Sequence, residues 1–206
     1  GFEAKKAVGK ELKGYQFRMQ VNVLDCMGCG NCADICPAKK PALVMKPLES
    51  QMDEVARHKY AARLPVRDDL TKRNTVKGSQ FVQPLLEFSG ACSGCGETPY
   101  LKLLTQLFGS RLVIANATGC SSIYGGNLPT TPWSQNETGR GPAWSNSLFE
   151  DNAEFGLGIR LGVDALAERS QRLVRSLADD LGDELVTALL APVAGEEMDA
   201  VGESNP

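Results

Sequence analysis

A run of four cysteines that ends in a proline constrains this sequence more than any other feature. It consists of Cys26, Cys29, Cys32, Cys36 and Pro37, with the spacing C-x2-C-x2-C-x3-C-P. This spacing is typical of bacterial ferredoxins, whose cysteine thiolates bind a 4Fe–4S cluster. It lets one tight loop reach three corners of a cubane, and Gly28 and Gly30 let backbone N–H groups approach the cluster sulfurs. The last cysteine, Cys36, is expected to open a short helix and to point away, toward a second cluster.

Two other kinds of site use closely spaced cysteines, a structural zinc site and a disulfide pair. Zinc ligands usually come as two separated C-x2-C pairs. Disulfide frameworks are typical of small secreted chains. The spacing of this run therefore favours an iron–sulfur cluster over both alternatives.

Length and composition narrow the class of protein. The chain has 206 residues, enough for one large or two modest domains, and its hydrophobic content of 42% excludes global disorder. The net charge of −3 argues against nucleic acid as a partner, since a basic surface is expected there. No apolar run reaches membrane-spanning length, and no signal-peptide pattern is present. Seven cysteines, four of them in a cluster pattern, indicate a reducing cytoplasm.

Both ends of the sequence suggest a piece of a longer polypeptide. The sequence starts at Gly1 without an initiator methionine, and residues 196–206 form an acidic stretch that contains glycine. We therefore expect further parts of the protein on either side.

The first part of the chain is expected to form half of a two-cluster ferredoxin. Apolar and polar residues alternate over residues 15–23, which predicts a half-buried strand that leads into the cysteine loop. Residues 42–45 are apolar and flanked by prolines, which predicts a second short strand. Residues 47–80 read as a polar connector with a domain boundary near residue 75. The single histidine, His58, lies among charged residues there and is assigned no role.

The second half of the chain predicts a helix followed by a strand. Thr98 and Pro99 form a helix start, with threonine as the cap and proline at the first helical position. This helix should end at Phe108, with its leucine-rich face in the core. The apolar run at 111–116 predicts a buried strand of the kind found in parallel sheets.

The remaining chain predicts a long loop and then helices. Residues 119–145 are irregular in composition, and their length and two tryptophans indicate an ordered, functional loop. A helix is expected over 147–181, with Ser147 and Glu150 as a capping box. Its glycines suggest close approach to a neighbouring element, and residues 183–190 are expected to add a short helix.

Three further cysteines predict a second metal site. Cys92 and Cys95 precede the helix start, and Cys120 follows the strand. In an open α/β sheet, strand ends and helix starts border the same crevice, so the three thiolates can converge. Three interpretations remain: unliganded core cysteines, a zinc site with another fourth ligand, and an iron–sulfur cluster whose fourth cysteine lies outside this sequence. We favour the iron–sulfur cluster, because the same chain also contains the cysteine run at residues 26–36.

Several motifs together resemble the pyruvate:ferredoxin (flavodoxin) oxidoreductases. The likeness covers nearly the whole chain. The motifs are Asp25–Cys32, Phe88–Thr98, Ala115–Ser122, Gly141–Trp144 and Ser147–Glu154.

This resemblance implies oxidative decarboxylation of pyruvate with coenzyme A in anaerobic metabolism. Electrons would pass from thiamine diphosphate through 4Fe–4S clusters to ferredoxin or flavodoxin. The implied cluster ligands are Cys26, Cys29, Cys32 and Cys36 in an outward relay, and Cys92, Cys95 and Cys120 in the cluster nearest the thiamine. The counterparts of Glu97 and Cys120 contact the thiamine cofactor. The resemblance assigns no catalytic residue to this chain.

The implied fold class is an α+β ferredoxin-like half-domain followed by part of an α/β thiamine diphosphate-binding domain. The half-domain with its connector is expected over residues 1–75, and the start of the second domain over 76–206. The thiamine site is incomplete, because no Gly-Asp-Gly motif is present and the magnesium ligands are expected outside this chain. We therefore expect the chain alone to be inactive and the full-length enzyme to be a cytoplasmic homodimer.

Two rival functions belong to other classes. A stand-alone iron–sulfur electron-transfer module would need the cysteine run but no substrate chemistry. A zinc-stabilised structural module would need the cysteines but no iron. The motif around Glu97 and Cys120 argues against a simple carrier, which needs no site at the end of a buried strand.

Overall fold

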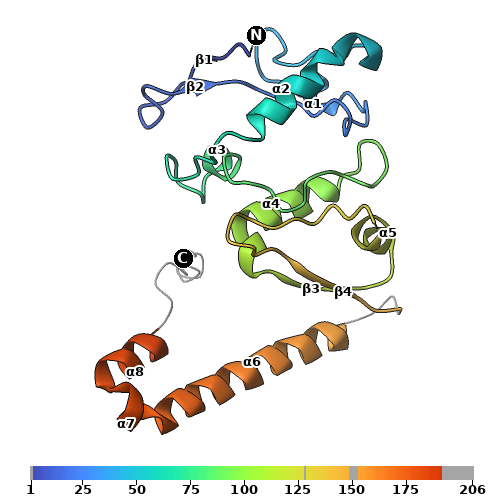
Figure 1. The fold of residues 1–206 in the computed structure, drawn as a ribbon. Helices are drawn as coiled ribbons and strands as arrows, with labels where there is room; N and C mark the ends of the chain where they lie inside the picture. The colour runs from blue at the N-terminus through green and yellow to red at the C-terminus, as the bar shows by residue number, and fades with distance from the viewer. Residues whose placement is uncertain (1, 128, 149–152, 192–206) are drawn as a thin grey trace, which may run out of the picture. The chain divides into compact units, whose positions relative to one another are not determined.

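Helices make up most of the regular structure in the computed structural model, which describes residues 2–127, 129–148 and 153–191 (Figure 1). The chain divides into two units, Gly1–Asn152 and Ala153–Pro206. The ferredoxin-like and thiamine-binding domains expected on either side of residue 75 stay a prediction. None of the described helices is both long and apolar enough to cross a lipid bilayer.

The chain begins with a short hairpin. Strand β1 (Lys5–Lys6) pairs antiparallel with β2 (Gln16–Phe17). The strand expected over 15–23 is thus much shorter than predicted, and the strand expected at 42–45 is absent from the described chain. The reason is that neither segment has a neighbouring strand to pair with beyond Phe17. Their apolar residues instead line one pocket together.

The connector at 47–80 contains more helix than predicted. It holds η1 (Leu48–Gln51), α2 (Asp53–Ala61) and α3 (Val76–Ser79). Helix α2 is tied to the hairpin region through Glu54, whose carboxylate accepts hydrogen bonds from Arg18 and Gln20, both at 3.0 Å.

Helix α4 (Thr98–Phe108) confirms the predicted helix start and end to within two residues. Its cap is Glu97 rather than Thr98, because the Thr98 hydroxyl is buried and donates to Ser89 Oγ at 3.0 Å. The most buried side chains of the helix body are also polar rather than leucines. Thr105 Oγ accepts the backbone N–H groups of Leu85 and Leu86 at 3.1 and 3.2 Å.

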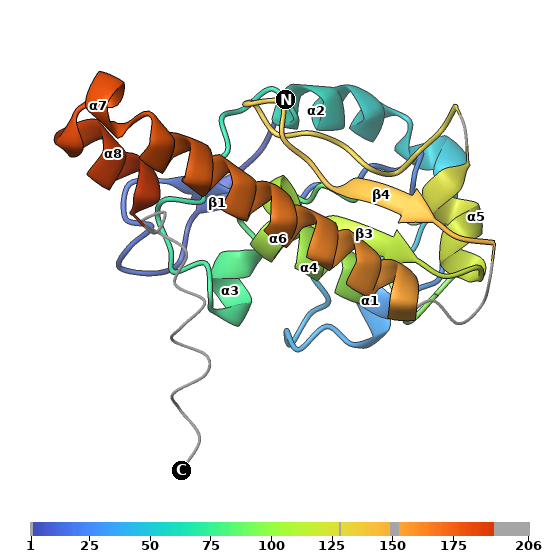
Figure 2. The same ribbon diagram turned by 90° about the horizontal axis from the view of Figure 1, so that it is seen from below.

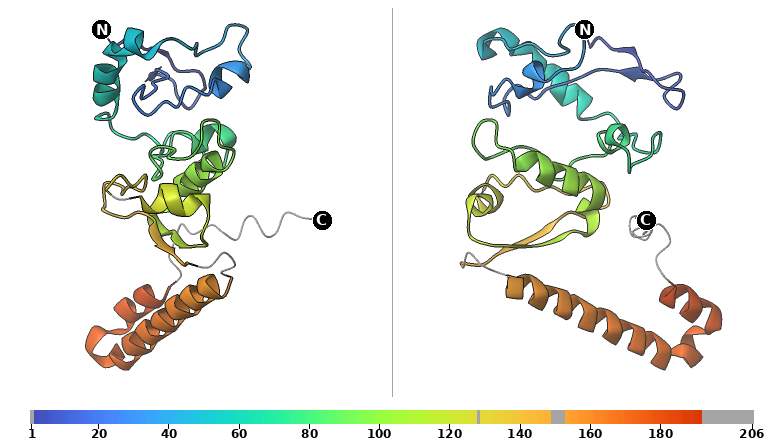
Figure 3. Two further views of the ribbon diagram at one scale, coloured as in Figure 1. Left: turned by 90° about the vertical axis from the view of Figure 1, so that its right-hand side faces the viewer. Right: turned by 180° about the vertical axis from the view of Figure 1, so that it is seen from behind.

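Two parallel strands follow α4 and η2 (Gly109–Arg111). Strand β3 (Val113–Asn116) pairs with β4 (Ala143–Asn146), and α5 (Cys120–Gly126) lies between them in the sequence. Figures 1 and 3 show α4 lying along one face of this pair. The predicted parallel pairing is therefore confirmed, but the predicted burial is wrong, since no residue of β3 is buried and Val113 is 50% exposed.

The segment 119–145, of which residues 119–127 and 129–145 are described, is not the irregular loop that was predicted. It contains α5 and the first part of β4, which the sequence analysis missed. Pro132 is fully buried, and Leu86 and Trp133 form an antiparallel bridge. The indole N–H of Trp133 also donates to the carbonyl of Gly125 at 3.0 Å. These contacts join the segment to the chain that precedes Cys92.

The described part of the second unit, residues 153–191, is mainly helical (Figure 2). It consists of α6 (Ala153–Ser176), α7 (Ala178–Leu181) and α8 (Asp183–Leu190). Helix α8 confirms the prediction, whereas the long predicted helix is interrupted after Ser176. Glu150 of the proposed capping box lies outside the described residues. No described atom lies within 4 Å of a Cβ built at Gly158 or Gly162, so the close approach expected there is not observed.

Candidate metal centre

The first cysteine loop lines a concave apolar pocket. Two left-handed glycines, Gly28 (φ 70°) and Gly30 (φ 82°), turn the backbone before α1 (Asn31–Asp34). Cys26 and Cys32 both line a pocket of about 490 Å³. Its apolar wall is formed by Met19, Val21, Val23, Leu43, Val44 and Met45. Two of the predicted ligands therefore border one cavity.

Cys36 differs from its predicted position. It follows α1 instead of opening a helix, because α1 begins after Gly30 and ends at Asp34. Its sulfur accepts the backbone N–H of Ala42 at 3.3 Å. The N–H groups of Ala42 and then Ala38 hold the thiol pKa of Cys36 below its usual value. A lowered pKa favours the thiolate, which is the form that binds metal.

Cys92 and Cys95 lie in the turn before α4. The backbone N–H of Cys95 donates to the carbonyl of Cys92 at 3.0 Å, which closes this turn. Backbone N–H groups of Thr98 and then Glu97 lower the pKa of the Cys95 thiol. The turn therefore favours a thiolate at Cys95.

Cys120 lies where it was predicted, just after strand β3, and it is the first residue of α5. A network of polar side chains surrounds this turn. Ser122 Oγ accepts the backbone N–H of Gly119 at 3.0 Å and the side-chain amide of Asn116 at 3.2 Å. Asn116 also donates to Asn146 Oδ1 at 2.9 Å. The network fixes the backbone that carries Cys120 to the ends of both strands.

Tyr124 connects the two halves of the second cysteine group. Its hydroxyl donates to Glu97 Oε1 at 3.1 Å. Burial raises the pKa of the Tyr124 hydroxyl above its usual value, and the Glu97 carboxylate and the charges of Cys95 and Cys120 raise it further. Since Tyr124 lies on the helix that begins at Cys120 and its hydroxyl bonds to Glu97, two residues after Cys95, it links the two chain segments that carry these cysteines.

The two cysteine loops also contact each other. Ser93 Oγ donates to the carbonyl of Met27 at 3.2 Å. A Cβ placed on Gly94 would lie 3.7 Å from Cys29 Cβ. Cys29 thus borders the second loop.

The cysteine thiols are the right ligands for an iron–sulfur cluster, but the structure does not bring three or more of them together at one metal site among the described residues. All seven cysteines are free thiols, and Cys36 and Cys95 are only partly exposed while the others are exposed. Thiolates are the ligands that iron–sulfur clusters require. Within the described residues, no three His, Cys, Asp or Glu side chains are arranged to hold a metal ion. The ligand assignment therefore stays a prediction.

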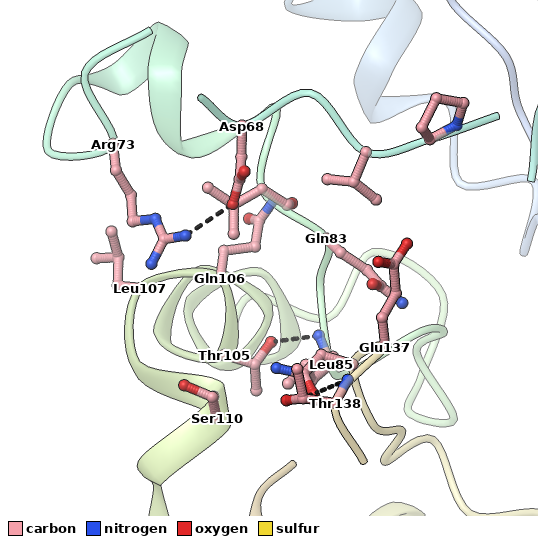
Figure 4. Close-up of a pocket in the computed structure, with 15 residues that line it drawn as sticks. Asp68, Arg73, Gln83, Leu85, Thr105, Gln106, Leu107, Ser110, Glu137 and Thr138 are labelled. Carbon is pink, nitrogen blue, oxygen red and sulfur yellow. Dashed lines mark hydrogen bonds and ion pairs between the residues drawn. The ribbon is translucent and has the colours of Figure 1, made fainter. Parts of the chain in front are cut away.

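A separate cavity of about 320 Å³ lies beside α4 (Figure 4). Its walls include the Asp68–Arg73 ion pair at 2.7 Å, Thr105 and Thr138. No cysteine lines it. The cavity therefore does not belong to the cysteine site.

Sequence reasoning missed two parts of this region. Tyr124 received no attention because α5 was read as loop. Asn116 and Ser122 lie within the motif Ala115–Ser122, but the sequence did not predict their hydrogen bonds. A signal was present, since Asn, Thr and Ser cluster directly after the apolar run of β3, as residues at strand-end sites often do.

Comparison with known proteins agrees with the resemblance. The 4Fe–4S binding domain family matches residues 19–39. The chain is 56% identical over 191 residues to the pyruvate-flavodoxin oxidoreductase of Enterobacter agglomerans, covering 93% of this chain and 16% of that protein. It is 57% identical over 194 residues to the pyruvate:ferredoxin oxidoreductase of Moorella thermoacetica, covering 94% of this chain and 16% of that protein.

The chain is homologous to a segment of the pyruvate:ferredoxin/flavodoxin oxidoreductases. The Klebsiella pneumoniae pyruvate-flavodoxin oxidoreductase extends the match to 98% of the chain at 50% identity, again over 16% of that protein. The segment therefore spans about one sixth of the length of these relatives.

Proposed function

We propose that this chain is part of an enzyme that oxidatively decarboxylates pyruvate with coenzyme A to acetyl-CoA. Electrons leave through 4Fe–4S clusters to ferredoxin or flavodoxin. The observation that carries the proposal is the identity of 56–57% to two such oxidoreductases over more than nine tenths of this chain. The match to the 4Fe–4S binding domain supports the electron-transfer part.

The first cysteine run holds iron–sulfur clusters in this proposal. Cys26 and Cys32 border a pocket with an apolar wall, and apolar surroundings tune the potential of a cluster. Cys29 and Cys36 complete the run, and Cys36 serves a neighbouring cluster whose other ligands lie outside this chain.

Cys92, Cys95 and Cys120 hold the cluster nearest to thiamine diphosphate, with a fourth cysteine outside this chain. Two observations support the grouping. The cysteines lie at a helix start and after a strand end, and Tyr124, on the helix that begins at Cys120, bonds to Glu97, two residues after Cys95. Glu97 and Cys120 contact the cofactor. Thiamine diphosphate, when bound, supplies the electron sink for decarboxylation, and the magnesium ligands lie outside this chain.

We infer that the two parts of the chain have different functions, with a boundary near residue 75 that is set by the sequence pattern. Residues 1–75 form the end of a ferredoxin-like domain, and residues 76–206 begin a thiamine diphosphate-binding α/β domain. The parallel β3–β4 pair, with polar groups at its carboxyl end, is the arrangement in which α/β proteins bind cofactors. The complete enzyme is proposed to be a cytoplasmic homodimer.

Anaerobic assay of the full-length protein tests the proposal. We expect pyruvate- and coenzyme A-dependent reduction of viologen, together with iron and acid-labile sulfide. Cys92→Ser should remove the signal of one cluster and abolish turnover. The segment of residues 1–206 should show no turnover. A full-length protein that contains iron and sulfide but does not oxidise pyruvate would contradict the proposed activity.

The second candidate is an iron–sulfur electron-transfer module without substrate chemistry. That function would need the cysteine run, of which Cys26 and Cys32 border one pocket, and no cofactor site. Thiamine diphosphate binding distinguishes the two, because only the oxidoreductase needs it. Zinc without sulfide would instead support a structural module.

A further inference from the structure

Tyr124 and Glu97 form a hydrogen-bonded pair between a buried side chain and an exposed residue. The Tyr124 side chain lies in α5 and is 4% exposed, whereas Glu97 is exposed at the start of α4. The Tyr124 hydroxyl donates to Glu97 Oε1 at 3.1 Å across 27 residues of sequence. A buried tyrosine hydroxyl usually has a hydrogen-bond partner, and here the partner is a carboxylate.

The backbone around Tyr124 has little freedom to move. A Cβ on Gly90 would lie 3.0 Å from Tyr124 Cβ, so the chain before Cys92 contacts the tyrosine closely. The Trp144 ring lies against the next residues, 3.2 Å from a Cβ placed on Gly125 and 3.0 Å from one on Gly126. The Trp133 indole holds the carbonyl of Gly125 at 3.0 Å. The phenol is therefore a rigid donor.

We propose that Tyr124 is a positioning residue for thiamine diphosphate, which holds the Glu97 carboxylate in the orientation that contacts the cofactor. The inference rests on the proposed function, because that function gives Glu97 its cofactor contact. An exposed glutamate otherwise samples several rotamers, and fixing them costs free energy on binding. The hydrogen bond from a rigid phenol to Oε1 fixes the carboxylate before the cofactor arrives.

The test uses the full-length protein depleted of thiamine diphosphate. Tyr124→Phe removes the hydroxyl and keeps the ring in place. We expect the dissociation constant for thiamine diphosphate, measured by calorimetry, to rise about tenfold, which corresponds to about 1.4 kcal/mol. The KM for thiamine diphosphate should rise by a similar factor while kcat at saturating cofactor changes less than about twofold. Iron content and thermal midpoint should stay unchanged.

Tyr100→Phe is the matched control, since Tyr100 lies on α4 and is 76% exposed. It should bind the cofactor as the wild type does. A double-mutant cycle with Glu97→Ala shows whether Tyr124 acts through the glutamate. Tyr124→Phe should weaken binding no further when Glu97 is already alanine. Independent, additive losses would overturn the inference.

Glu97→Asp keeps the charge but draws the carboxylate back from the phenol. It should weaken binding at least as much as Tyr124→Phe does, and it tests whether the position of the carboxylate matters even if Tyr124→Phe does not fold. Unchanged affinity in either folded variant overturns the role of Tyr124 and leaves the proposed function intact. A wild-type protein that binds no thiamine diphosphate would instead overturn the proposed function.

Discussion

Asn116 and Asn146 are register partners at the carboxyl end of β3 and β4, and the side-chain amide of Asn116 donates to Asn146 Oδ1 at 2.9 Å. Ser122 Oγ joins both side chains, with Asn146 Oδ1 at 2.9 Å and Asn116 Nδ2 at 3.2 Å. This arrangement couples the strand pair to the first turn of α5. Cys120 is therefore held by side-chain hydrogen bonds in addition to the backbone of its own helix.

Ser122→Ala should loosen the turn that carries Cys120. The change removes the acceptor for the Gly119 N–H and the Asn116 amide. A hydrogen bond contributes about 1 kcal/mol, so amide hydrogen exchange in residues 116–124 of the full-length protein should accelerate about fivefold.

Ser170→Ala is the control for that experiment. The Ser170 hydroxyl donates only to the carbonyl of Leu166 in its own helix at 2.9 Å, so its loss should have little effect on exchange. Equal protection of residues 116–124 in Ser122→Ala and wild type would contradict the role of the network.

Gly78→Ala should destabilise the segment around α3 strongly. A Cβ at Gly78 would lie 1.9 Å from the carbonyl oxygen of Lys72, and backbone atoms cannot yield as a flexible side chain can. Overpacking of this kind costs about 1–3 kcal/mol or more. Faster hydrogen exchange over residues 72–80 would be the expected measurement.

Gly158→Ala should stabilise its helix, whereas Gly78→Ala should destabilise the segment around α3. This helical glycine has no described atom within 4 Å of a built Cβ, so alanine should stabilise α6 by about 0.5–1 kcal/mol. Slower exchange in α6 is expected. If α6 opened more readily with alanine, Gly158 would have to contact a part of the protein outside the described chain.

Several helices and strands could be predicted from the sequence of a single segment. Thr98, Pro99 and the leucines that follow predicted α4, and a short helix was expected over residues 183–190, where α8 lies. The apolar run before Asn116 gave β3 and so placed Cys120 at a strand end. In each case one segment carries enough propensity and patterning to specify its own structure.

Other elements depend on partners that a local pattern does not contain. Helix α5 is short and rich in serine and glycine, so its propensity is low, and Trp133 and Trp144 hold it from outside. The hydrogen bond from Tyr124 to Glu97 joins residues that are 27 positions apart, and it could not be predicted without first predicting α5. Conversely, residues 15–23 alternate as a strand should but lack a partner beyond Phe17.

Glu54 should make the contact between α2 and the hairpin region pH-dependent. The hydrogen bond from Gln20, followed by Arg57 and Arg18, holds the pKa of the Glu54 carboxyl below its usual value. A depressed folded-state pKa means that the ionised carboxylate stabilises the fold above its unfolded-state pKa. This stabilisation is lost as the pH falls through the folded-state pKa.

Glu54→Gln should therefore lower the urea midpoint of the cluster-free protein at pH 7 and have less effect as the pH falls below about 4, the ordinary range of a glutamate pKa. The comparison with Glu49→Gln is informative, because Glu49 is exposed in the neighbouring turn. A midpoint difference between wild type and Glu54→Gln that stays constant from pH 7 to pH 3 would show that the Glu54 charge is not involved.

Cluster assembly should protect the cysteines from alkylation. All seven are free thiols, and Cys26, Cys29, Cys32, Cys92 and Cys120 are exposed. In the chelator-treated full-length protein, iodoacetamide should modify every one of these seven, as counted by peptide mass spectrometry. After anaerobic reconstitution with iron and sulfide, all seven should become resistant, since a thiolate bound to iron is no longer a free nucleophile.

Protection that covers the cysteines at 26–36 but leaves Cys92, Cys95 and Cys120 reactive would confine the iron to the first run. Ser93→Ala, which removes the hydroxyl bond to Met27, is the control that should leave protection unchanged.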